Sequence, residues 1–458
     1  MTDHVISRNP TSGEIIATYP LQSAAELETA LQQSASAFAQ WRNTEMAQRV
    51  KVLRQLGEQL RQRQDQLATL ATLEMGKPIA QARAEVLKCA SLCDWYAEHG
   101  PAMLADQPTL VENQQAWQSF RPLGVILAVM PWNFPYWQVL RGAVSMLLAG
   151  NTYLLKHAPS VMGCARLMQE LFAATDLPRG AFNVINVDND GVSAAIKDPR
   201  VAAVAVTGSV RAGGAIAAQA GAVLKKTVLE LGGADPFIVL ADADLDAAVA
   251  SAVTGRYQNS GQVCMAAKRF IIEESIAEAF EARFSAAVQA LRVGDPLQEE
   301  TYIGPMARYD LRDELDHQVQ ETLQQGARLV LGGYKIEGVG NYYAATILAD
   351  VTPAMTAFRQ EIFGPVAAIT VARDAQHALQ LANDSEFGLS ATVWSGNEAL
   401  AQELAEQLET GAVFINGNGA SDPRVAIGGV KKSGYGRELS SFGVHEFCNI
   451  QTVWKNRR

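Results

Sequence analysis

Leucines recur at helix-face spacing in the first hundred residues of the chain. They are separated by Gln-rich and Arg-rich positions, which gives one apolar face; the leucines are Leu53, Leu56, Leu60, Leu67 and Leu70. The pattern ends at a Gly-Lys-Pro sequence that begins at Gly76, and Gly and Pro are typical of a helix end. This segment is therefore predicted to be mainly helical, with an amphipathic helix that stops near residue 76.

From about residue 122 the pattern changes to short apolar runs separated by helix-length segments. The runs cover residues 124–130, 152–155, 181–187, 201–206, 226–229 and 236–240. Strands that are apolar on both faces indicate a parallel sheet covered on both sides. Helices are expected at 136–149, 161–175, 191–197 and 212–220. This βαβ series predicts an α/β fold with a doubly wound, Rossmann-type nucleotide-binding sheet.

A second α/β stretch is predicted from residue 244 to about 430. It begins with an Ala-rich helix, contains apolar runs at 367–371 and 389–394, and ends in a Gly-rich segment at 427–436. Two further segments, 109–121 and 445–454, have the pattern of extended strands but lie outside both βαβ series. Strands at an edge are suited to pairing with another subunit.

Composition narrows the class of protein. A chain of 458 residues with 48% hydrophobic and 19% charged residues is long enough for two or three globular domains at roughly 150 residues each. A net charge of −10 argues against nucleic acid as the main ligand. There is no apolar run of the ~20 residues that a membrane span needs, and the first twenty residues do not resemble a signal peptide. We expect no membrane partner.

The cysteines and histidines suggest a reducing compartment and no metal. Five cysteines are widely scattered, which favours reduced thiols in the cytoplasm. Six histidines show no ligand spacing, and Cys89 and Cys93 have no second pair to complete a zinc site. The sequence therefore predicts a cytoplasmic protein without a metal centre.

Three polar residues stand in settings that suit catalysis. Cys264 follows a Gly turn, where a thiol can act as a nucleophile; a lone cysteine is also commonly a small buried hydrophobe. Glu230 ends an apolar run before two glycines, where a carboxylate can face the ligand crevice as a general base or simply face solvent. Asn133 lies between two prolines and suits either an oxyanion donor or a turn.

A Gly-Ser pair opens a predicted helix. Gly208 and Ser209, with Gly213 after them, follow an apolar strand, and backbone N–H groups at such a position can bind a phosphate. The pattern is not the GxGxxG fingerprint, and Gly-rich strand–helix turns are common. Lys156, directly after another apolar strand, is placed to reach a ribose or a phosphate.

The motifs become specific when they are taken together and in order. PWNFP, a strand ending in Lys, TGS, LELGG, GQVC, EIFGP and GGVKKSGYGRE follow one another along essentially the whole chain. This series resembles the aldehyde dehydrogenase superfamily. Within it, the chain is most similar to bacterial NAD(P)-dependent succinate-semialdehyde dehydrogenases.

The resemblance implies catalytic roles. Cys264 would attack the aldehyde carbon, and Asn133 with the Cys264 backbone N–H would form the oxyanion hole. Hydride would leave the hemithioacetal for the nicotinamide, and Glu230 would activate water to hydrolyse the resulting thioester.

The resemblance also implies a coenzyme site. The expected contacts are Trp132, Asn133, Lys156, His157, Ala158, Pro159, Gly208, Ser209, Gly213, Leu231, Glu361 and Phe363. Strict NAD users of the family commonly carry a Glu three residues after the Lys, where it repels a 2′-phosphate. Here that position is Pro159. We therefore expect NAD or NADP, with dual use.

The substrate is expected to be an aldehyde with a distal carboxylate. Arg141 lies where the similar enzymes place an arginine on that carboxylate; the alternative is a surface arginine at a helix end. Those enzymes often carry a second arginine where this chain has Gln258, and Ser421 and Arg424 would supply the missing contacts. The leading activity is oxidation of succinate semialdehyde to succinate. The alternative is a broader enzyme for glutarate semialdehyde or aliphatic aldehydes.

The family pattern implies three parts. A Rossmann-type coenzyme domain is expected at 1–104 and 122–232, and an α/β catalytic domain at 233–440. A small β element for oligomerisation would combine 105–121 with 441–458 and give a dimer or a tetramer.

Overall fold

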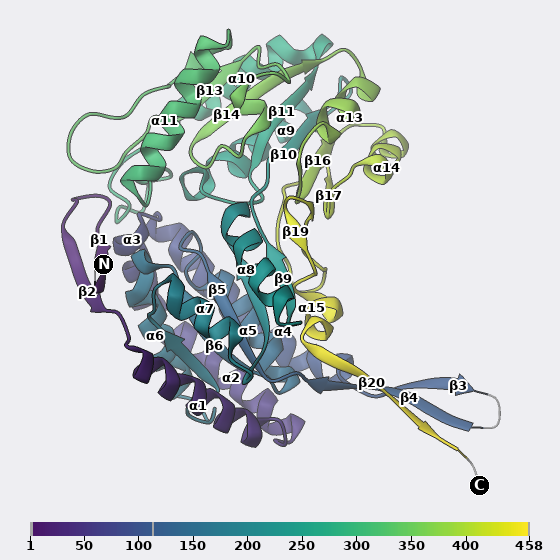
Figure 1. Ribbon diagram of the computed structural model, residues 1–458. Coiled ribbons are helices and arrows are strands. Elements are labelled where there is room, and N and C mark those ends of the chain that lie inside the picture. Colours follow the sequence, from purple (N-terminus) through teal and green to yellow (C-terminus); the bar gives the residue numbers. More distant parts are fainter. Residues whose placement is uncertain (1–2, 112–113, 457–458) are drawn as a thin grey trace.

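The computed structural model describes residues 3–111 and 114–456 (Figure 1). It begins with a short antiparallel hairpin and then has four helices. These elements are β1 (His4–Arg8), β2 (Ile15–Pro20), α1 (Ala24–Trp41), α2 (Met46–Gln62), α3 (Gln64–Met75) and α4 (Ile79–Met103). The predicted helix ends at Gly76, whose φ of 78° is the left-handed conformation that favours glycine. The leucine stripe nevertheless spans two helices, because the backbone leaves helical geometry at Arg63.

The first sheet has six strands in the order β19-β9-β8-β5-β6-β7 and is parallel except for β19. The strands are β5 (Val125–Met130), β6 (Thr152–His157), β7 (Phe182–Ile185), β8 (Val201–Thr207), β9 (Lys226–Glu230) and β19 (Gly434–Tyr435). The connecting helices are α5 (Trp137–Ala149), η1 (Pro159–Val161), α6 (Met162–Ala173), α7 (Asn189–Lys197) and α8 (Val210–Ala222). After β5 the chain adds β6 and β7 on one side of it and then β8 and β9 on the other side, so the strand order reverses at β5. Ligands bind at such a switch point, outside the carboxyl ends of the strands.

The second sheet has seven strands in the order β12-β13-β14-β11-β10-β16-β17, with only β12 antiparallel to its neighbour. Its strands are β10 (Asp235–Val239), β11 (Ala267–Glu273), β12 (Arg328–Leu331), β13 (Thr346–Ala349), β14 (Val366–Ala372), β16 (Ser390–Trp394) and β17 (Ala412–Ile415). The helices are α9 (Leu245–Tyr257), η2 (Gln258–Gly261), η3 (Glu274–Ile276), α10 (Ala277–Gln289), α11 (Tyr309–Gln324), α12 (Thr356–Arg359), α13 (Ala375–Asn383) and α14 (Glu398–Gln407). A two-stranded pair joins β15 (Phe387–Gly388) to β18 (Val430–Lys431). The α/β fold class predicted from the sequence is confirmed.

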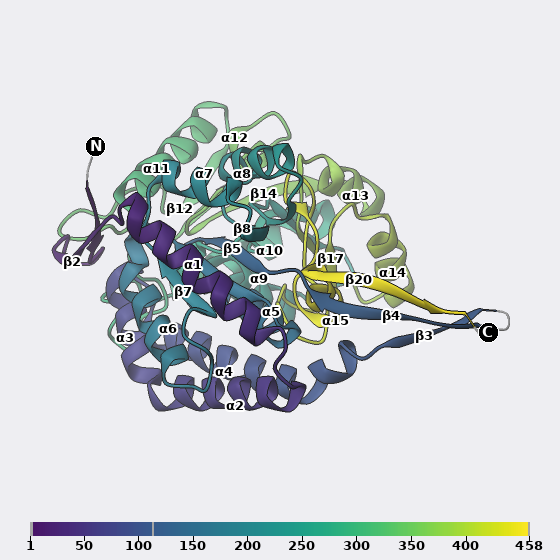
Figure 2. The ribbon, with the colours of Figure 1, turned by 60° about the horizontal axis from the view of Figure 1, so that its bottom comes forward.

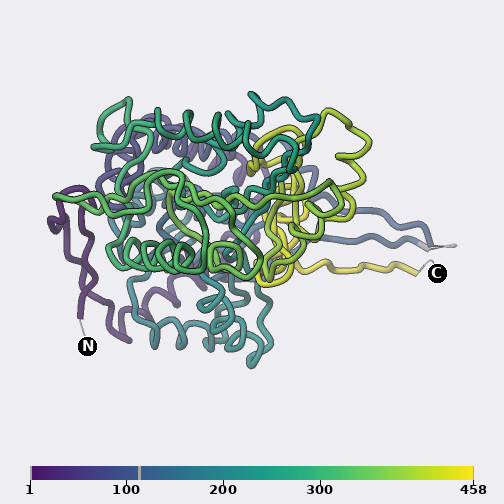
Figure 3. The backbone as a smooth tube through the Cα atoms, turned by 90° about the horizontal axis from the view of Figure 1, so that it is seen from above, coloured from purple at the N-terminus to yellow at the C-terminus, as the bar shows by residue number. Residues whose placement is uncertain are grey.

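A three-stranded antiparallel arm projects from the body (Figures 1 and 2). It consists of β3 (Gln107–Val111), β4 (Gln114–Pro122) and β20 (Cys448–Lys455), and α15 (Ser440–Glu446) leads into β20. The two stray strands predicted from the sequence therefore pair with each other, although His445 belongs to α15. The arm lies at the opposite end of the molecule from the N-terminal hairpin (Figure 3).

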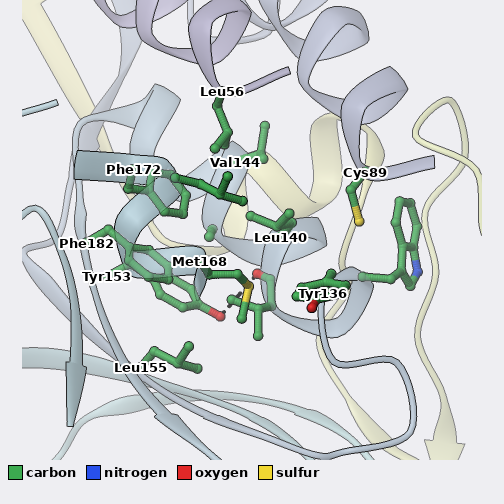
Figure 4. Close-up of a cluster of buried hydrophobic side chains, with 14 of the residues drawn as sticks. Leu56, Cys89, Tyr136, Leu140, Val144, Tyr153, Leu155, Met168, Phe172 and Phe182 are labelled. Atoms are coloured by element: carbon green, nitrogen blue, oxygen red, sulfur yellow. Dashed lines mark hydrogen bonds between the residues drawn. The ribbon is translucent and has the colours of Figure 1, made fainter. Parts of the chain in front are cut away.

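The main core lies between the first sheet and the helices that cover one of its faces. Figure 4 shows side chains of α2, α4, α5, α6, β6 and β7 meeting there, among them Leu56, Cys89, Leu140, Met168 and Phe172. Every residue of α5 is buried, which is typical of a helix inside a large core. A polar side chain on α5 must therefore find its partners inside the protein.

None of the helices in the described ranges is long and apolar enough to cross a membrane. The three predicted domain ranges remain a prediction. One observation bears on their bounds: β19 lies within the range predicted for the catalytic domain but pairs with β9 of the first sheet.

Candidate active site

A strained turn presents Cys264. Asn259 and Ser260 have φ of 52° and 54°, and Gly261 has φ of 72°, so three successive residues adopt left-handed backbone conformations. A Cβ on Gly261 would lie 2.2 Å from the carbonyl oxygen of Gly364, so only glycine fits this approach. Such strain persists where the surrounding structure holds it and is typical of functional sites.

Cys264 differs from the other four cysteines, because they are buried and Cys264 is partly exposed. Burial of the thiol raises its pKa to about 11, while the nearby Arg141 and Lys268 act in the opposite direction. Lys268 lies beneath the turn, where its ammonium donates to the carbonyl oxygens of Cys264 at 2.6 Å and Val263 at 3.1 Å. The reactive sulfur is thus held protonated until a base or a ligand changes its surroundings.

Asn133 reaches the same turn from the first sheet. Its Nδ2 donates to the carbonyl oxygen of Gln262 at 3.0 Å, and Asn259 Nδ2 donates to the carbonyl oxygen of Asn133 at 2.8 Å. The amide orientation is assigned from this network. Because the Asn133 amide has two N–H groups and Gln262 takes one, the other remains for an oxyanion beside Cys264.

Buried charges fix the loop that carries Asn133. Glu85 on α4 accepts from the backbone N–H groups of Tyr136 and Trp137, at 2.9 Å each, and so caps the start of α5. Lys77 forms an ion pair with Glu85 inside the protein and lies 3.7 Å from the centroid of the Phe134 ring. The α4 helix therefore sets the direction of the oxyanion loop.

His157 supports this loop from the end of β6. Its Nδ1 accepts from the Ala158 N–H at 3.0 Å, so the protonated Nε2 donates to the carbonyl oxygen of Pro135 at 2.9 Å. Burial lowers the pKa of His157 to about 4, so the ring is neutral at physiological pH. The ring offers the coenzyme no free polar atom, and only the backbone of His157 is available for the predicted contact.

A cleft of about 760 Å³ opens at the switch point of the first sheet and extends to Cys264. Most residues predicted to bind the coenzyme line it, namely Trp132, Asn133, Gly208, Ser209, Leu231, Glu361 and Phe363. Gly208 faces open space, and Ser209 caps α8 by accepting from the Ala212 N–H at 3.3 Å. An anion is favoured at a helix start of this kind.

Other predicted coenzyme residues lie around this cleft. A Cβ on Gly213 would meet the Leu231 side chain at 2.5 Å, so glycine lets α8 approach the strand end. Ala158 and Pro159 line a neighbouring cavity of about 490 Å³ together with Trp132. Lys156 lies one residue before the end of β6, and burial lowers its pKa. The set predicted from sequence thus surrounds one edge of the first sheet.

The second sheet supplies the far wall of the cleft. Glu361 accepts from the Gly233 N–H at 3.0 Å and lies 3.2 Å from the Lys268 ammonium. Phe363 meets Trp132 edge to face with ring centroids 5.9 Å apart. Both sheets therefore contribute to the cleft that ends at Cys264.

Glu230 belongs to a buried group of three charges. Arg141 Nη2 lies 3.6 Å from Glu230 Oε2, and Arg141 Nε forms an ion pair with Glu438. Burial raises the pKa of Glu230 to about 8; Arg141 opposes the shift and Glu438 adds to it. Glu230 Oε1 has no hydrogen-bond partner within the described chain. A carboxylate of this kind is suited to act as a general base near neutral pH.

Comparison with known proteins identifies the family of this chain. Residues 2–453 match the model of the aldehyde dehydrogenase family. The chain belongs to this family. It is 66% identical over 454 residues to the NAD(P)+ succinate semialdehyde dehydrogenase Sad of Escherichia coli K12, covering 99% of this chain and 98% of that protein.

Two further proteins similar to this aldehyde dehydrogenase are also named as succinate-semialdehyde dehydrogenases. A probable NADP+ succinate-semialdehyde dehydrogenase of Synechocystis is 47% identical over 97% of this chain and 98% of its own length. The crystal structure of succinic semialdehyde dehydrogenase from Streptococcus pyogenes with NADP+ superposes with a TM-score of 0.97 at 35% identity, covering 99% of this chain and 100% of that one. The family predicted from the sequence is confirmed.

The residues predicted to bind substrate have different surroundings in this aldehyde dehydrogenase. Arg141 is 2% exposed and paired with two carboxylates, so the alternative of a surface arginine is wrong. Ser421 accepts a hydrogen bond from Lys88 at 2.8 Å. Arg424 is exposed, and both its Nε and Nη2 donate to Asp422 at 2.8 Å. Substrate contact by all three remains a prediction.

Sequence reasoning did not assign roles to Lys268, Glu438, Glu85 or Lys88. Glu438 lies in the GYGRE motif, and Lys268 lies four residues after Cys264. Their positions next to recognised motifs could have marked both as candidate site residues. Glu85 and Lys88 lie on an amphipathic helix far away in sequence, where nothing local marks them. Among the described residues, no group of His, Cys, Asp and Glu side chains is placed to hold a metal ion.

Proposed function

We propose that this chain oxidises succinate semialdehyde to succinate, with NAD+ or NADP+ as the hydride acceptor. The observation that carries the proposal is the convergence of Cys264, Asn133 and the coenzyme-type cleft at one turn. The 66% identity to a succinate semialdehyde dehydrogenase supports the choice of substrate.

Acylation begins at Cys264. Its sulfur, as the thiolate, forms a bond to the aldehyde carbon, and the carbonyl oxygen becomes an oxyanion. The second Asn133 N–H and the Cys264 backbone N–H would stabilise that oxyanion. When bound, NAD+ or NADP+ accepts the hydride that leaves this carbon, and the carbon remains on Cys264 as a thioester.

Deacylation needs a base, and Glu230 supplies it. The carboxylate takes a proton from water as the water oxygen attacks the thioester carbon. The C–S bond then breaks, and succinate and the Cys264 thiolate separate. Burial next to Arg141 and Glu438 gives Glu230 a pKa of about 8, so it is basic enough to take the proton and is still partly ionised near neutral pH.

The residues of the cleft fit a dinucleotide. Gly208 leaves open space for a pyrophosphate at the start of α8, where an anion is favoured, while its own N–H donates to the carbonyl oxygen of Glu230 at 3.0 Å. Pro159 stands where a carboxylate would repel a 2′-phosphate. The absence of that charge supports use of both coenzymes.

A kinetic comparison tests the proposal. Succinate semialdehyde and butanal have the same carbon chain, but only the former carries a carboxylate. Reduction of NAD+ and of NADP+ is followed with each aldehyde. We expect kcat/KM for succinate semialdehyde to exceed that for butanal by about 10- to 100-fold, since a charge-assisted hydrogen bond contributes ~1.5–3 kcal/mol. Cys264→Ala serves as the inactive control.

Equal kcat/KM values for the two aldehydes would contradict the proposed substrate and favour a broad aliphatic specificity. Glutarate semialdehyde, which is one methylene longer, is the third substrate in the series. A kcat/KM for it above that for succinate semialdehyde would shift the assignment to the longer substrate.

We also propose that the protein self-associates through its arm and acts in the cytoplasm. Both edge strands of the arm, β3 and β20, are largely exposed, and Leu110 and Ile450 are exposed apolar side chains on them. A small sheet without a covering layer is marginally stable in water, so a partner surface would complete it. The five free cysteines suit a reducing compartment.

A further inference from the structure

Lys88 lies where three segments of the chain meet. It is exposed on α4, its ammonium donates to Ser421 Oγ at 2.8 Å, and it lies 4.1 Å from the centroid of the Trp137 ring. Trp137 begins α5, and Ser421 lies on the loop that follows β17. The ring and the hydroxyl hold the ammonium in one place.

This position borders the catalytic turn without lining the coenzyme cleft. Trp137 comes directly before Gln138, which lines the cleft with Cys264, and four residues after Asn133. A Cβ on Gly419 would lie 3.5 Å from the carbonyl oxygen of Met265, so the loop that carries Ser421 passes beside the residue after Cys264. Neither Lys88, Trp137 nor Ser421 lines the cleft. An aldehyde must approach Cys264 from a side that the coenzyme does not occupy, and the loop that binds Lys88 through Ser421 passes beside Met265 outside the cleft.

Lys88 differs from the two nearby arginines, Arg141 and Arg424, because its ammonium has no carboxylate partner among the described residues. Arg141 is enclosed by Glu230 and Glu438, and Arg424 is held by Asp422. In the described ranges, no carboxylate lies within ion-pair distance of the Lys88 ammonium, which has only a hydroxyl and an aromatic face. An anion entering beside Cys264 would therefore find an unpaired counter-ion on Lys88.

We propose that Lys88, together with Ser421, binds the distal carboxylate of the aldehyde and so selects substrates that carry one. The inference rests on the proposed function, in which the substrate has that carboxylate. The ammonium would donate to one carboxylate oxygen. The Ser421 hydroxyl, which accepts from Lys88, has its own hydrogen free to donate to the other oxygen.

The electrostatic setting agrees with a binding role. Desolvation, with a smaller contribution from Arg141 on α5, lowers the pKa of Lys88 to about 8. Cys89 and Glu85 on α4 and Asp422 on the loop act in the opposite direction. A bound carboxylate would restore the missing negative charge and raise the pKa of the ammonium.

Substitution of Lys88 tests the assignment. Lys88→Met removes the charge and keeps an unbranched side chain, while Lys88→Arg keeps the charge. We expect Lys88→Met to raise KM for succinate semialdehyde by about tenfold or more, as loss of a charged hydrogen bond implies, with kcat nearly unchanged. KM for butanal should not rise, and Lys88→Arg should retain most of the wild-type preference. Lys51→Met, an exposed lysine on α2, is the matched control.

The pH dependence gives a second measurement that a structural role would not change. As pH rises through about 8, wild-type Lys88 loses its proton, so the ratio of kcat/KM for succinate semialdehyde to that for butanal should fall. In Lys88→Met this ratio should not change with pH, because any effect of Glu230 is common to both aldehydes.

The outcomes separate the two proposals. If wild type prefers succinate semialdehyde but Lys88→Met changes KM for both aldehydes equally, or for neither, Lys88 is not the carboxylate site and the proposed function stands. If wild type shows no preference between the aldehydes, the proposed function and this inference both fail.

Discussion

At the scale of single residues, burial sets the protonation of the two groups proposed to react. It raises the pKa of the Cys264 thiol to about 11 and that of Glu230 to about 8. Both groups are therefore mainly protonated near neutral pH in the free protein. Arg141 opposes both shifts, so one guanidinium tunes the nucleophile and the base together.

The pH profile of the deacylation step should follow Glu230. The base works as the carboxylate, so kcat should rise with pH through about 8 when thioester hydrolysis limits the rate. Glu230→Gln should lower kcat by ~10²–10⁴-fold and remove the rise, while a first burst of reduced coenzyme remains. Rapid-mixing absorbance measurements across pH check this. Loss of the burst together with kcat would place Glu230 in the first step instead.

At the scale of elements, α5 connects the core to the chemistry. It is buried on all sides and begins directly after the oxyanion loop, so its position fixes that of Asn133. Glu85 of α4 caps this start, and Lys77 neutralises Glu85 within the core. The helices α4 and α5 thus decide where the oxyanion donor points.

Glu85→Gln tests this connection. The amide keeps an oxygen for the cap but removes the charge opposite Lys77, and breaking a buried pair from one side costs ~3–5 kcal/mol. We expect a lower melting temperature and a kcat reduced by at least about tenfold, since a displaced oxyanion donor loses transition-state stabilisation.

Arg283→Gln, which breaks the exposed pair with Asp246, is the control for this variant. It should alter stability by less than about 1 kcal/mol. Thermal melts and steady-state rates are measured on both variants. A Glu85 variant that melts early but keeps full kcat below its melting point would show that the cap serves stability alone.

At the scale of the whole molecule, the three-stranded arm projects from the body, so most of the side chains on β3 and β20 are exposed. Its strands pair only with one another, β20 with β4 and β4 with β3. Their exposed apolar side chains would be costly to leave in water. Self-association is the simplest way to cover them.

A charge on the arm should therefore weaken assembly. Ile450→Asp places a carboxylate on an exposed face of β20, whereas Ile450→Thr keeps a β-branched side chain and serves as the control. We expect wild type and Ile450→Thr to be dimeric or tetrameric and Ile450→Asp to dissociate at lower concentration. Light scattering after size exclusion measures the masses. A wild-type protein that is monomeric at all concentrations would refute assembly through the arm.

The sequence by itself determined the family and the fold class, and it predicted the nucleophile. These depend on local signals: apolar runs of strand length, Gly and Pro turns, and short motifs whose residues are close together, as around Cys264 and Asn133. The α5 and α8 helices begin and end within a few residues of their predicted bounds for the same reason. The break at Arg63 was missed because the apolar stripe continues across it.

Only the tertiary structure decided which charges meet. Arg141 has the same local sequence whether it faces a substrate or two carboxylates, and its contact with Glu438 joins residues far apart in the chain. Lys88 and Ser421 are likewise brought together by folding, 333 positions apart. The interaction between two charged side chains depends on their distance in space and on their desolvation, and neither can be derived from the order of residues in the sequence.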